Sequence, residues 1–560
     1  MTLPLVGAED GRVVSGVGGI SQMGSTTTVT QSSPQLSLTW KNFNIGANES
    51  VNFVQPSSTA VAVNRITDPN ATQILGRLNA NGQVFLINPN GILFGQGAQV
   101  DVGGIVASTL DLNDASLATN SKSFRDSGSA AGRIINHGSI RTTEGGYVAL
   151  LGSAVSNHGN ITTPGGTVAF GAGRAATLTF AENRLVQMQV AEGVLNSLAE
   201  NGGLIRADGG MVVLNAGAKN ELLASVVNNT GVIQARRVEN RGGTIVLLGG
   251  MQSGTVNVGG TLDAAADPSG TGDGGFIETS GAHVKVGSDA KITTVSTTGK
   301  TGTWLIDPVD FTIAASGGDI TGATLSTNLG SGNVVIQSTS GITGTAGNVN
   351  VNDAVTWSAN RLTLNAQNNI LINANLNASS AASLALEFGQ GAVAAGNTSN
   401  VITTGAAVNL PAGTTNFTTK KGSDGVVKAY TVITSLGAAG SVTVTDLQGM
   451  SGGLATNYAL GANINAATTS SWNSGAGFAP VGNSSSGFTG TFDGLGHTIT
   501  GLTINRGTSY TGLFGQTNAG SVVQNVGLFG GTVGGGSGNY VGALVGNAGG
   551  RSRTVIRLPA

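Results

Sequence analysis

One short unit recurs along the first half of this sequence and limits how the chain can fold. The unit is Asn-x-Gly-x-Ile, and each copy is followed by a Gly-Gly pair that opens a short apolar segment. The four copies are Asn136–Ile140, Asn157–Ile161, Asn201–Ile205 and Asn229–Ile233. The segments after them are Gly145–Leu150, Gly165–Phe170, Gly209–Leu214 and Gly242–Leu247, with a weaker fifth at Gly274–Glu278. The Gly-Gly pairs lie 20, 44, 33 and 32 residues apart, near multiples of a 20-odd-residue period.

This unit predicts a corner followed by a strand. Asn and Gly accept left-handed backbone conformations and therefore suit tight turns. The residues after Gly-Gly alternate so that one face is apolar. One unit cannot bury that face alone, but stacked copies bury a continuous core. We therefore expect an all-β chain, a parallel β-helix. A propeller would show roughly 40–50-residue blades with aromatic signatures, and only 4% of these residues are aromatic.

Composition excludes several other classes. A hydrophobic fraction of 39% with a net charge of −2 does not fit a disordered chain. A pI near 6.1 offers no basic stripe for phosphates, so no nucleic-acid partner is expected. No run approaches 18 apolar residues, the length of a membrane span. The absence of cysteine is compatible with export. Met1–Gly11 lacks a basic region and a long apolar region, so no signal peptide is visible.

Histidines give little reason to expect catalysis or a metal. The four are His137, His158, His283 and His497. His137 and His158 occupy the same position of neighbouring Asn-His-Gly units and are expected to stack one rung apart. A metal would need further ligands, which these corners do not supply. We therefore expect no metal and no cofactor.

Two pairs of carboxylates were weighed as a sugar-cleaving site, because glycoside hydrolysis needs two carboxyls roughly 5–9.5 Å apart. The pairs are Asp267 with Asp273, and Asp307 with Asp310. Asp267 and Asp273 lie in a glycine-rich loop, and Asp307 precedes Pro308, so all three are typical of turns. The sequence therefore favours a protein that is not an enzyme.

Two further patterns follow from composition alone. Gly270–Gly275 matches GxGxxG, but a loop precedes it and a β pattern follows, where a dinucleotide site needs a strand and a helix. Asn-x-Ser/Thr sequons are expected by chance in a chain rich in these residues; examples begin at Asn48, Asn70, Asn160 and Asn228.

The most informative segment is Asn79–Leu112. Two predicted strands, Val84–Ile87 and Ile92–Phe94, flank the corner Asn88-Pro89-Asn90-Gly91. Proline fixes φ and Asn-Gly accepts positive φ, so the sequence strongly specifies a tight turn here. Such a corner can set the register of the fold, and an exposed one can also be recognised.

In this region the chain resembles the secretion domain of the filamentous-haemagglutinin family, the exported partners of bacterial two-partner secretion. The resemblance continues in the same style to about Ile313. It rests on Asn88–Gly91 and on Gly16–Thr30, Trp40–Gly46, Val51–Pro56, Val63–Ile66, Gln73–Gly76 and Gly103–Leu112. A second family motif, Asn-Pro-Asn-Leu, is missing; the nearest stretch is Asp68–Ala71, which resembles the high-molecular-weight-adhesin branch more than the cysteine-containing, haem-acquiring members.

The resemblance implies a right-handed β-helix with an N-terminal cap. It also implies passage through the periplasm of a Gram-negative bacterium and then through an outer-membrane β-barrel transporter. Asn88, Pro89, Asn90 and Gly91 match the family's secretion motif. The function implied is that of a secreted or surface-exposed, haemagglutinin-like adhesin involved in cell adhesion and virulence, with a sugar or protein receptor on host cells or matrix.

The expected organisation has four parts. Residues 1–310 form the two-partner secretion (haemagglutination activity) domain with the first rungs, and residues 311–487 an Asn/Thr/Ser-rich shaft. Residues 488–550 carry glycine-rich short repeats such as Gly512–Gly515, and residues 551–560 read as a truncated or aberrant tail. Two alternatives stay open, a polysaccharide-degrading β-helix enzyme and a non-functional fragment of a larger adhesin.

Overall fold

The computed structural model describes residues 7–126, 128, 132–192, 196–217, 225–239, 241–269, 272–339 and 346–558. The chain forms two compact units, each described by itself below. The first comprises residues 1–310 with 331–333 and 341–345, and the second comprises residues 311–330, 334–340 and 346–560. No helix among the described residues is long and apolar enough to cross a membrane.

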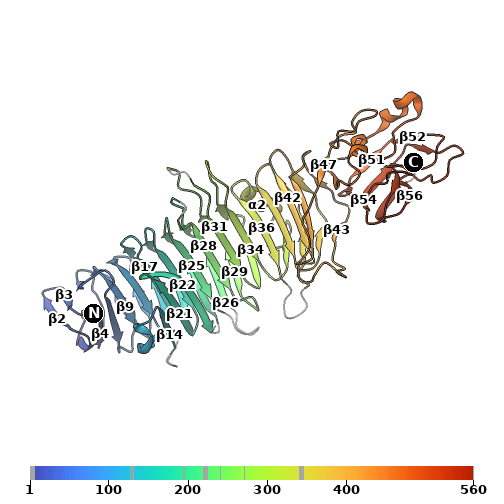
Figure 1. Cartoon of the computed structure of the whole chain (residues 1–560). Coiled ribbons are helices and arrows are strands. Elements are labelled where there is room, and N and C mark those ends of the chain that lie inside the picture. Colours follow the sequence, from blue (N-terminus) through green and yellow to red (C-terminus); the bar gives the residue numbers. More distant parts are fainter. Residues whose placement is uncertain are drawn as a thin grey trace. The chain divides into compact units, whose positions relative to one another are not determined.

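The first unit is a parallel β-helix with three sheets, whose strands run side by side in Figure 1. Each turn of the chain adds one strand to sheet 1, then sheet 2, then sheet 3. Sheet 1 holds β1 (Arg12–Ser15), β4 (Gln35–Trp40), β6 (Val61–Ile66), β9 (Gln83–Ile87), β12 (Gly104–Ser108), β17 (Tyr147–Gly152), β20 (Thr167–Ala172), β25 (Met211–Ala216), β28 (Thr244–Gly249), β31 (Phe276–Ser280) and β34 (Thr303–Asp307). Sheet 2 holds β7 (Thr72–Ile74), β10 (Ile92–Phe94), β15 (Arg133–Asn136), β18 (Ala154–Asn157), β23 (Ser197–Asn201), β26 (Ser225–Asn229), β29 (Thr255–Val258) and β32 (His283–Val286).

Sheet 3 begins with the N-terminal cap. Its strand β2 pairs antiparallel with β3, and in sheet 1 β1 pairs antiparallel with β4, while the remaining pairs of the three sheets are parallel. The predicted all-β fold, a parallel β-helix with an N-terminal cap, is confirmed. Sheet 3 holds β2 (Gly18–Met23), β3 (Thr26–Gln31), β5 (Ser50–Val54), β8 (Arg77–Ala80), β11 (Gln99–Val102), β16 (Ser139–Thr142), β19 (Asn160–Thr162), β24 (Leu204–Arg206), β27 (Val232–Gln234), β30 (Thr261–Asp263) and β33 (Lys291–Thr293).

The repeated asparagine does not act as predicted. Asn136, Asn157, Asn201 and Asn229 end successive strands of sheet 2, and each side chain is completely buried. Each amide nitrogen donates to the side-chain oxygen one rung on, at 2.7 Å from Asn136, 2.8 Å from Asn157 and 2.9 Å from Asn201. The last, Asn229, donates to the carbonyl of Gly259 at 2.7 Å. The expectation of a left-handed corner was wrong, because these residues are selected to fill a buried hydrogen-bonded ladder.

The glycines of the Gly-Gly pairs divide the work. The first, as in Gly145, Gly165 and Gly209, has positive φ of 72°, 59° and 74° and makes the turn. The second stacks on the rung below. A Cβ on Gly166 would collide with the carbonyl oxygen of Gly146, and one on Gly210 with that of Gly166. The strands predicted after these pairs are present as β17, β20, β25, β28 and β31.

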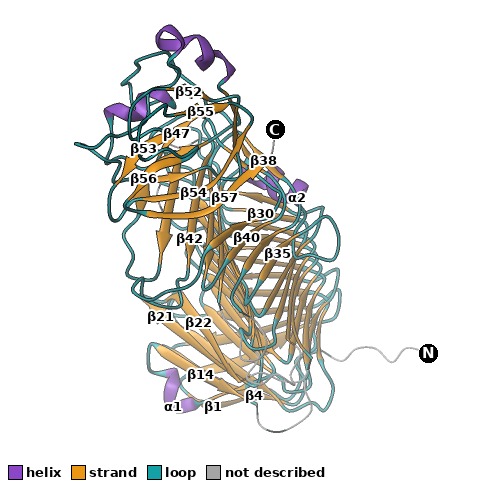
Figure 2. Ribbon diagram, turned by 90° about the vertical axis from the view of Figure 1, so that its right-hand side faces the viewer, coloured by secondary structure: helices purple, strands orange, loops and turns teal. Residues whose placement is uncertain are grey.

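Strands β9, β12, β17 and β20 are buried on both faces, whereas one apolar face was expected. Their outer face packs under an antiparallel sheet that leaves the helix in two excursions, with α1 beside β14 in Figure 2. This layer adds an outer core that includes Phe85, Phe124, Tyr147, Phe180 and Met188. The second excursion also explains why two Gly-Gly pairs are 44 residues apart. The layer comprises β13 (Asp111–Leu112), α1 (Asp114–Leu117), β14 (Ser121–Arg125), β21 (Ala175–Ala181) and β22 (Arg184–Glu192).

The second unit starts as a β-helix and changes at about residue 430. Its helical part holds β35 (Phe311–Ile313), α2 (Gly322–Leu329), β36 (Asn333–Ser338), β37 (Val349–Val351), β38 (Val355–Trp357), β39 (Arg361–Ala366), β40 (Ile370–Ile372), β41 (Leu376–Ala378), β42 (Ser383–Phe388), β43 (Val401–Thr403), β44 (Val408–Asn409), β45 (Phe417–Lys421) and β46 (Lys428–Ala429). The antiparallel β45–β46 pair ends this part.

A separate core follows, built around Phe488, Phe492 and Phe514, with ring centroids 4.9 Å and 5.3 Å apart. Arg551–Leu558, at the start of the predicted tail, forms β57 beside β54, and residues 559–560 lie outside the described residues. This part holds β47 (Thr431–Ile433), η1 (Gln448–Gly452), β48 (Tyr458–Leu460), β49 (Ile464–Asn465), η2 (Ala467–Gly475), β50 (Thr491–Asp493), β51 (Thr498–Thr500), β52 (Thr503–Asn505), β53 (Phe514–Thr517), β54 (Val522–Phe529), β55 (Thr532–Gly534), β56 (Val545–Ala548) and β57.

Candidate functional site

The Asn88-Pro89-Asn90-Gly91 corner links β9 of sheet 1 to β10 of sheet 2. Asn88 is completely buried, and its amide nitrogen donates to the carbonyl of Asn70 at 3.0 Å and to the hydroxyl of Thr72 at 2.9 Å. Its side-chain oxygen accepts from the backbone N–H of Asn90 at 2.9 Å. Gly91 has φ of 117° and donates to the carbonyl of Asn88. The corner is therefore a closed turn fastened to the rung before it.

Asn90 is the exposed member of the corner. Its amide nitrogen donates to the carbonyl of Asp68 at 2.8 Å, and no other side-chain bond of Asn90 is recorded within the described part. Pro89 is half-buried beside it. The four motif residues thus divide into a buried anchor, Asn88, and an exposed tip, Asn90.

The corner stacks on the Asp68-Pro69-Asn70 loop, which stands where some relatives of the resemblance carry their second motif. The two loops have the same internal geometry, because the Asp68 carboxylate accepts from the N–H of Asn70 at 2.9 Å as Asn88 accepts from Asn90. Sequence reasoning noted this loop but missed its role as the corner's support. The recurrence of X-Pro-Asn 20 residues earlier was the signal for it.

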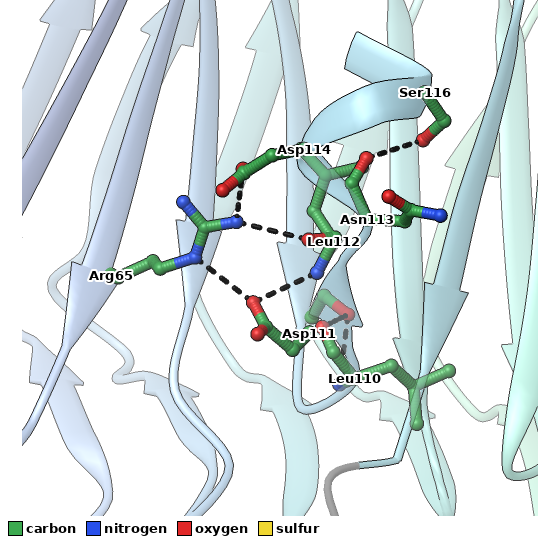
Figure 3. A network of polar contacts seen from close by, with 8 residues as sticks. Arg65, Leu110, Asp111, Leu112, Asn113, Asp114 and Ser116 are labelled. Atoms are coloured by element: carbon green, nitrogen blue, oxygen red, sulfur yellow. Dashed lines mark hydrogen bonds and ion pairs between the residues drawn. The ribbon is translucent and has the colours of Figure 1, made fainter. Parts of the chain in front are cut away.

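The rung after the corner is reached only through the first excursion. A Cβ on Gly132 would collide with the carbonyl of Pro89, so the returning chain lies directly on the corner. Arg65 fastens this excursion, as Figure 3 shows: its guanidinium donates to Asp111 at 3.0 Å, to Asp114 at 2.6 Å and to the carbonyl of Leu112 at 3.0 Å. Arg65 was not singled out from the sequence, since nothing local marks an arginine that bridges 46 positions.

The stacking predicted for the two histidines is confirmed. The rings of His137 and His158 have centroids 5.2 Å apart and planes 19° apart, and both are exposed. Glu200 lies 4.0 Å from His158. Among the described residues, no group of three or more His, Cys, Asp or Glu side chains could hold a metal ion.

The carboxylates considered for catalysis act within loops. Asp267 is exposed and accepts from Ser269, which lowers its pKa through the backbone and hydroxyl hydrogen bonds. Asp273 accepts from the N–H of Lys300 at 2.7 Å. Asp307 ends β34, and its nearest charged neighbour is Glu278 on β31 rather than the expected Asp310. Gly270 and Thr271, at the start of the GxGxxG match, lie outside the described residues.

Asp307 provides a pH test. Burial, and then the charge of Glu278, raise the pKa of Asp307 to about 6. Between about pH 4 and pH 6 the folded chain keeps a proton that the unfolded chain has lost, so the stability falls as the pH rises through this window. We expect Asp307→Asn to stabilise the protein at pH 7.5 by about 1 kcal/mol, after allowance for solvent screening, and not at pH 4. Thermal unfolding at both pH values measures this, with exposed Asp101→Asn as control. An equal loss of stability at both pH values would contradict it.

The sequons fall on different surroundings. Asn48, Asn70 and Asn160 are exposed, whereas Asn228 is half-buried and donates to Glu200 at 3.2 Å. Whether any of them is glycosylated stays a prediction of the sequence pattern.

Comparison with known proteins identifies the region that contains the corner. Residues 7–264 match the family model described as TPS secretion domain. The chain carries a TPS secretion domain. The two-partner secretion family inferred from the sequence is therefore confirmed, and Asn88–Gly91 lies inside the matched TPS domain.

Two curated relatives of the chain come from Haemophilus influenzae, and both are called heme/hemopexin-binding protein. One, from strain KW20 / Rd, is 37% identical over 243 residues, which are 42% of this chain and 26% of that protein. The other is 30% identical over 242 residues, or 39% of this chain and 26% of that protein. The chain thus matches these relatives over about a quarter of their length.

A solved structure extends the likeness in fold. The crystal structure of the HMW1 secretion domain from Haemophilus influenzae matches with a TM-score of 0.52 and 25% sequence identity. The match covers 72% of this chain and 98% of that domain. The expected resemblance to the high-molecular-weight-adhesin branch and the relatives named for haem or hemopexin binding therefore both concern the TPS domain and its rungs.

Proposed function

We propose that the chain is the exported partner of a two-partner secretion system and acts as a secreted or surface-exposed, adhesin-like protein. The observation that carries this proposal is the TPS secretion domain over residues 7–264, followed by further β-helix. The partner is an outer-membrane β-barrel transporter, reached through the periplasm of a Gram-negative bacterium, and the receptor is a sugar or protein of a host cell or matrix. A non-enzymatic role in cell adhesion and virulence is part of the proposal.

The geometry supplies a mechanism for export without ATP at the outer membrane. Each completed rung exposes three strand edges on which the next rung can pair. The buried asparagine ladder and the stacked glycines fix the register of that pairing. Stability in such a solenoid grows rung by rung, so folding outside the cell would draw the chain outward.

We also propose that residues 1–310 are the export and cap region, followed by the 311–487 shaft, the 488–550 repeats and the 551–560 tail. Because the chain corresponds to about a quarter of its curated relatives, it is also compatible with a piece of a larger adhesin. The haem or hemopexin named in those relatives is not assigned to this chain. The chain's own carboxylates, Asp267, Asp273 and Asp307, support binding rather than polysaccharide cleavage.

The secretion motif is tested by comparing its buried and exposed members. Asn88→Ala leaves buried groups of the Asn70–Thr72 segment without a partner and should lower stability by about 1–3 kcal/mol. Asn90→Ala loses one exposed hydrogen bond and should change stability by less than about 1 kcal/mol. We nevertheless expect both variants to lower the secreted yield severalfold with the cognate transporter. Denaturant unfolding and the amount of protein in the medium are the two measurements.

The exposed Asn48→Ala serves as the control, since it changes the same residue type in the TPS domain away from the corner. A loss of secretion in Asn90→Ala with unchanged stability would mean that the tip is recognised. A loss in Asn88→Ala alone would mean that the corner acts through folding. Normal secretion of both variants would show that the proposed role of Asn88–Gly91 is wrong.

A further inference from the structure

A cleft of about 540 Å³ lies within the second unit, outside the TPS domain. Strands β42, β43 and β45 of the helical part line one side, and β50 and β54 of the following part line the other. Its volume falls in the range of sites that take small ligands, roughly 300–1,000 Å³. None of its lining residues belongs to the corner or to the carboxylate pairs weighed from the sequence.

The floor of the cleft is a fixed polar group. Asp493 is 5% exposed and accepts hydrogen bonds from the side-chain amides of Gln524 at 2.6 Å and Asn525 at 3.0 Å, and from the N–H of Leu495 at 3.0 Å. Burial raises the pKa of Asp493. Because each amide uses its nitrogen on the carboxylate, its carbonyl oxygen is the group held for a ligand hydroxyl. A buried carboxylate that orients two amides is a built site rather than a surface accident.

The walls are aromatic and the rim is cationic. Phe388 and Phe417 line the cleft with Tyr430, and the rings of Phe417 and Tyr430 have centroids 5.0 Å apart. The ammonium of Lys421 lies 5.9 Å from the centroid of Phe388. Lys428 and Arg551 are exposed at the opening. Three cations therefore face the ligand space, whereas Asp493 is the one carboxylate among the described residues that line it.

We propose that this cleft binds an acidic saccharide without cleaving it. The pinned amide oxygens of Gln524 and Asn525 suit sugar hydroxyls, and the rings suit the C–H faces of a pyranose. The rim cations pair with the sugar carboxylate through charge-assisted hydrogen bonds. Hydrolysis would need a second carboxyl facing the first. The inference rests on the proposed adhesin role, for which it names the receptor chemistry.

Binding of a galacturonate tetrasaccharide to the full 560-residue chain, measured by calorimetry, tests this proposal. Its neutral methyl ester is the matched ligand. We expect the acidic form to bind at least about tenfold more tightly, and the affinity to fall as salt is raised. Lys421→Gln with Lys428→Gln should weaken binding by about tenfold or more. Lys291→Gln, an exposed lysine on β33 of the first unit, is the control and should not change it. Gln524→Ala tests the floor from an independent position.

The outcomes separate the proposal from the proposed function. Equal affinity for the acidic and neutral forms, or unchanged affinity in both cleft variants, would overturn the acidic-saccharide assignment. So would failure of a folded, secreted chain to bind either ligand, and such a result would leave the export role intact. Shortened products after incubation would overturn binding without cleavage. Failure of export with normal binding would instead contradict the proposed function alone.

Discussion

Replacing Gly166 with alanine is expected to lower the free energy of unfolding by at least about 3 kcal/mol, the upper end of what overpacking costs. A Cβ at this position would meet the carbonyl oxygen of Gly146 below it, and backbone cannot move aside as a flexible side chain can. The alanine itself would sit beneath Gly210, whose own Cβ position is already blocked by the Gly166 carbonyl. The rungs on both sides must therefore separate.

Gly19→Ala is the matched control. Gly19 lies on the exposed cap strand β2, where an added Cβ would meet nothing within 4 Å. That substitution should change stability by less than about 1 kcal/mol. Denaturant unfolding of both variants measures the difference, and amide hydrogen exchange should place the loss of protection around β17, β20 and β25. Equal stability of Gly166→Ala and the wild type would show that the rungs are not stacked as described.

Asn157→Ala is expected to cost roughly 2–4 kcal/mol, because removing one side chain leaves two buried neighbours incomplete. Asn136 loses its acceptor at 2.7 Å, and the side-chain oxygen of Asn201 loses its donor at 2.8 Å. No solvent reaches these completely buried amides to replace the lost bonds. The destabilisation should therefore exceed that of an ordinary surface substitution several times over.

Asn228→Ala provides the comparison within the same sheet. Asn228 precedes the ladder residue Asn229 on β26, points outward and is half-buried, with one bond of 3.2 Å to Glu200. It should lower stability by less than about 1 kcal/mol. Chemical denaturation of the two single variants and of the pair gives the cost of each. A cost of Asn157→Ala no greater than that of Asn228→Ala would contradict the buried ladder.

The fold could be read from the sequence because its determinants are local and repeated. The Gly-Gly pairs, the apolar strands after them and the Asn88–Gly91 corner each lie within a few residues of chain, and the strands predicted from them are present. The asparagines were located correctly but misread. A turn-forming asparagine and a buried ladder asparagine leave the same mark in the sequence, and only the register between rungs distinguishes them.

Features built from distant segments could not be foreseen. The antiparallel layer over β17 and β20 depends on two excursions more than 40 residues apart, and the Arg65 network joins positions 46 and 49 residues apart. The cleft around Asp493 combines strands from before and after the change at residue 430. No local pattern marks such residues, since each of them is an ordinary polar side chain until the chain has folded.

Export through a dedicated transporter is the central claim, and transporter dependence tests it most directly. The full chain would be produced behind a cleavable export signal, with and without the cognate outer-membrane transporter, and protein in the medium and on intact cells would be quantified. We predict protease-resistant β-helical protein outside the cell only when the transporter is present, and retention in the periplasm without it. Equal amounts outside the cell in both strains, or retention in both, would contradict the account.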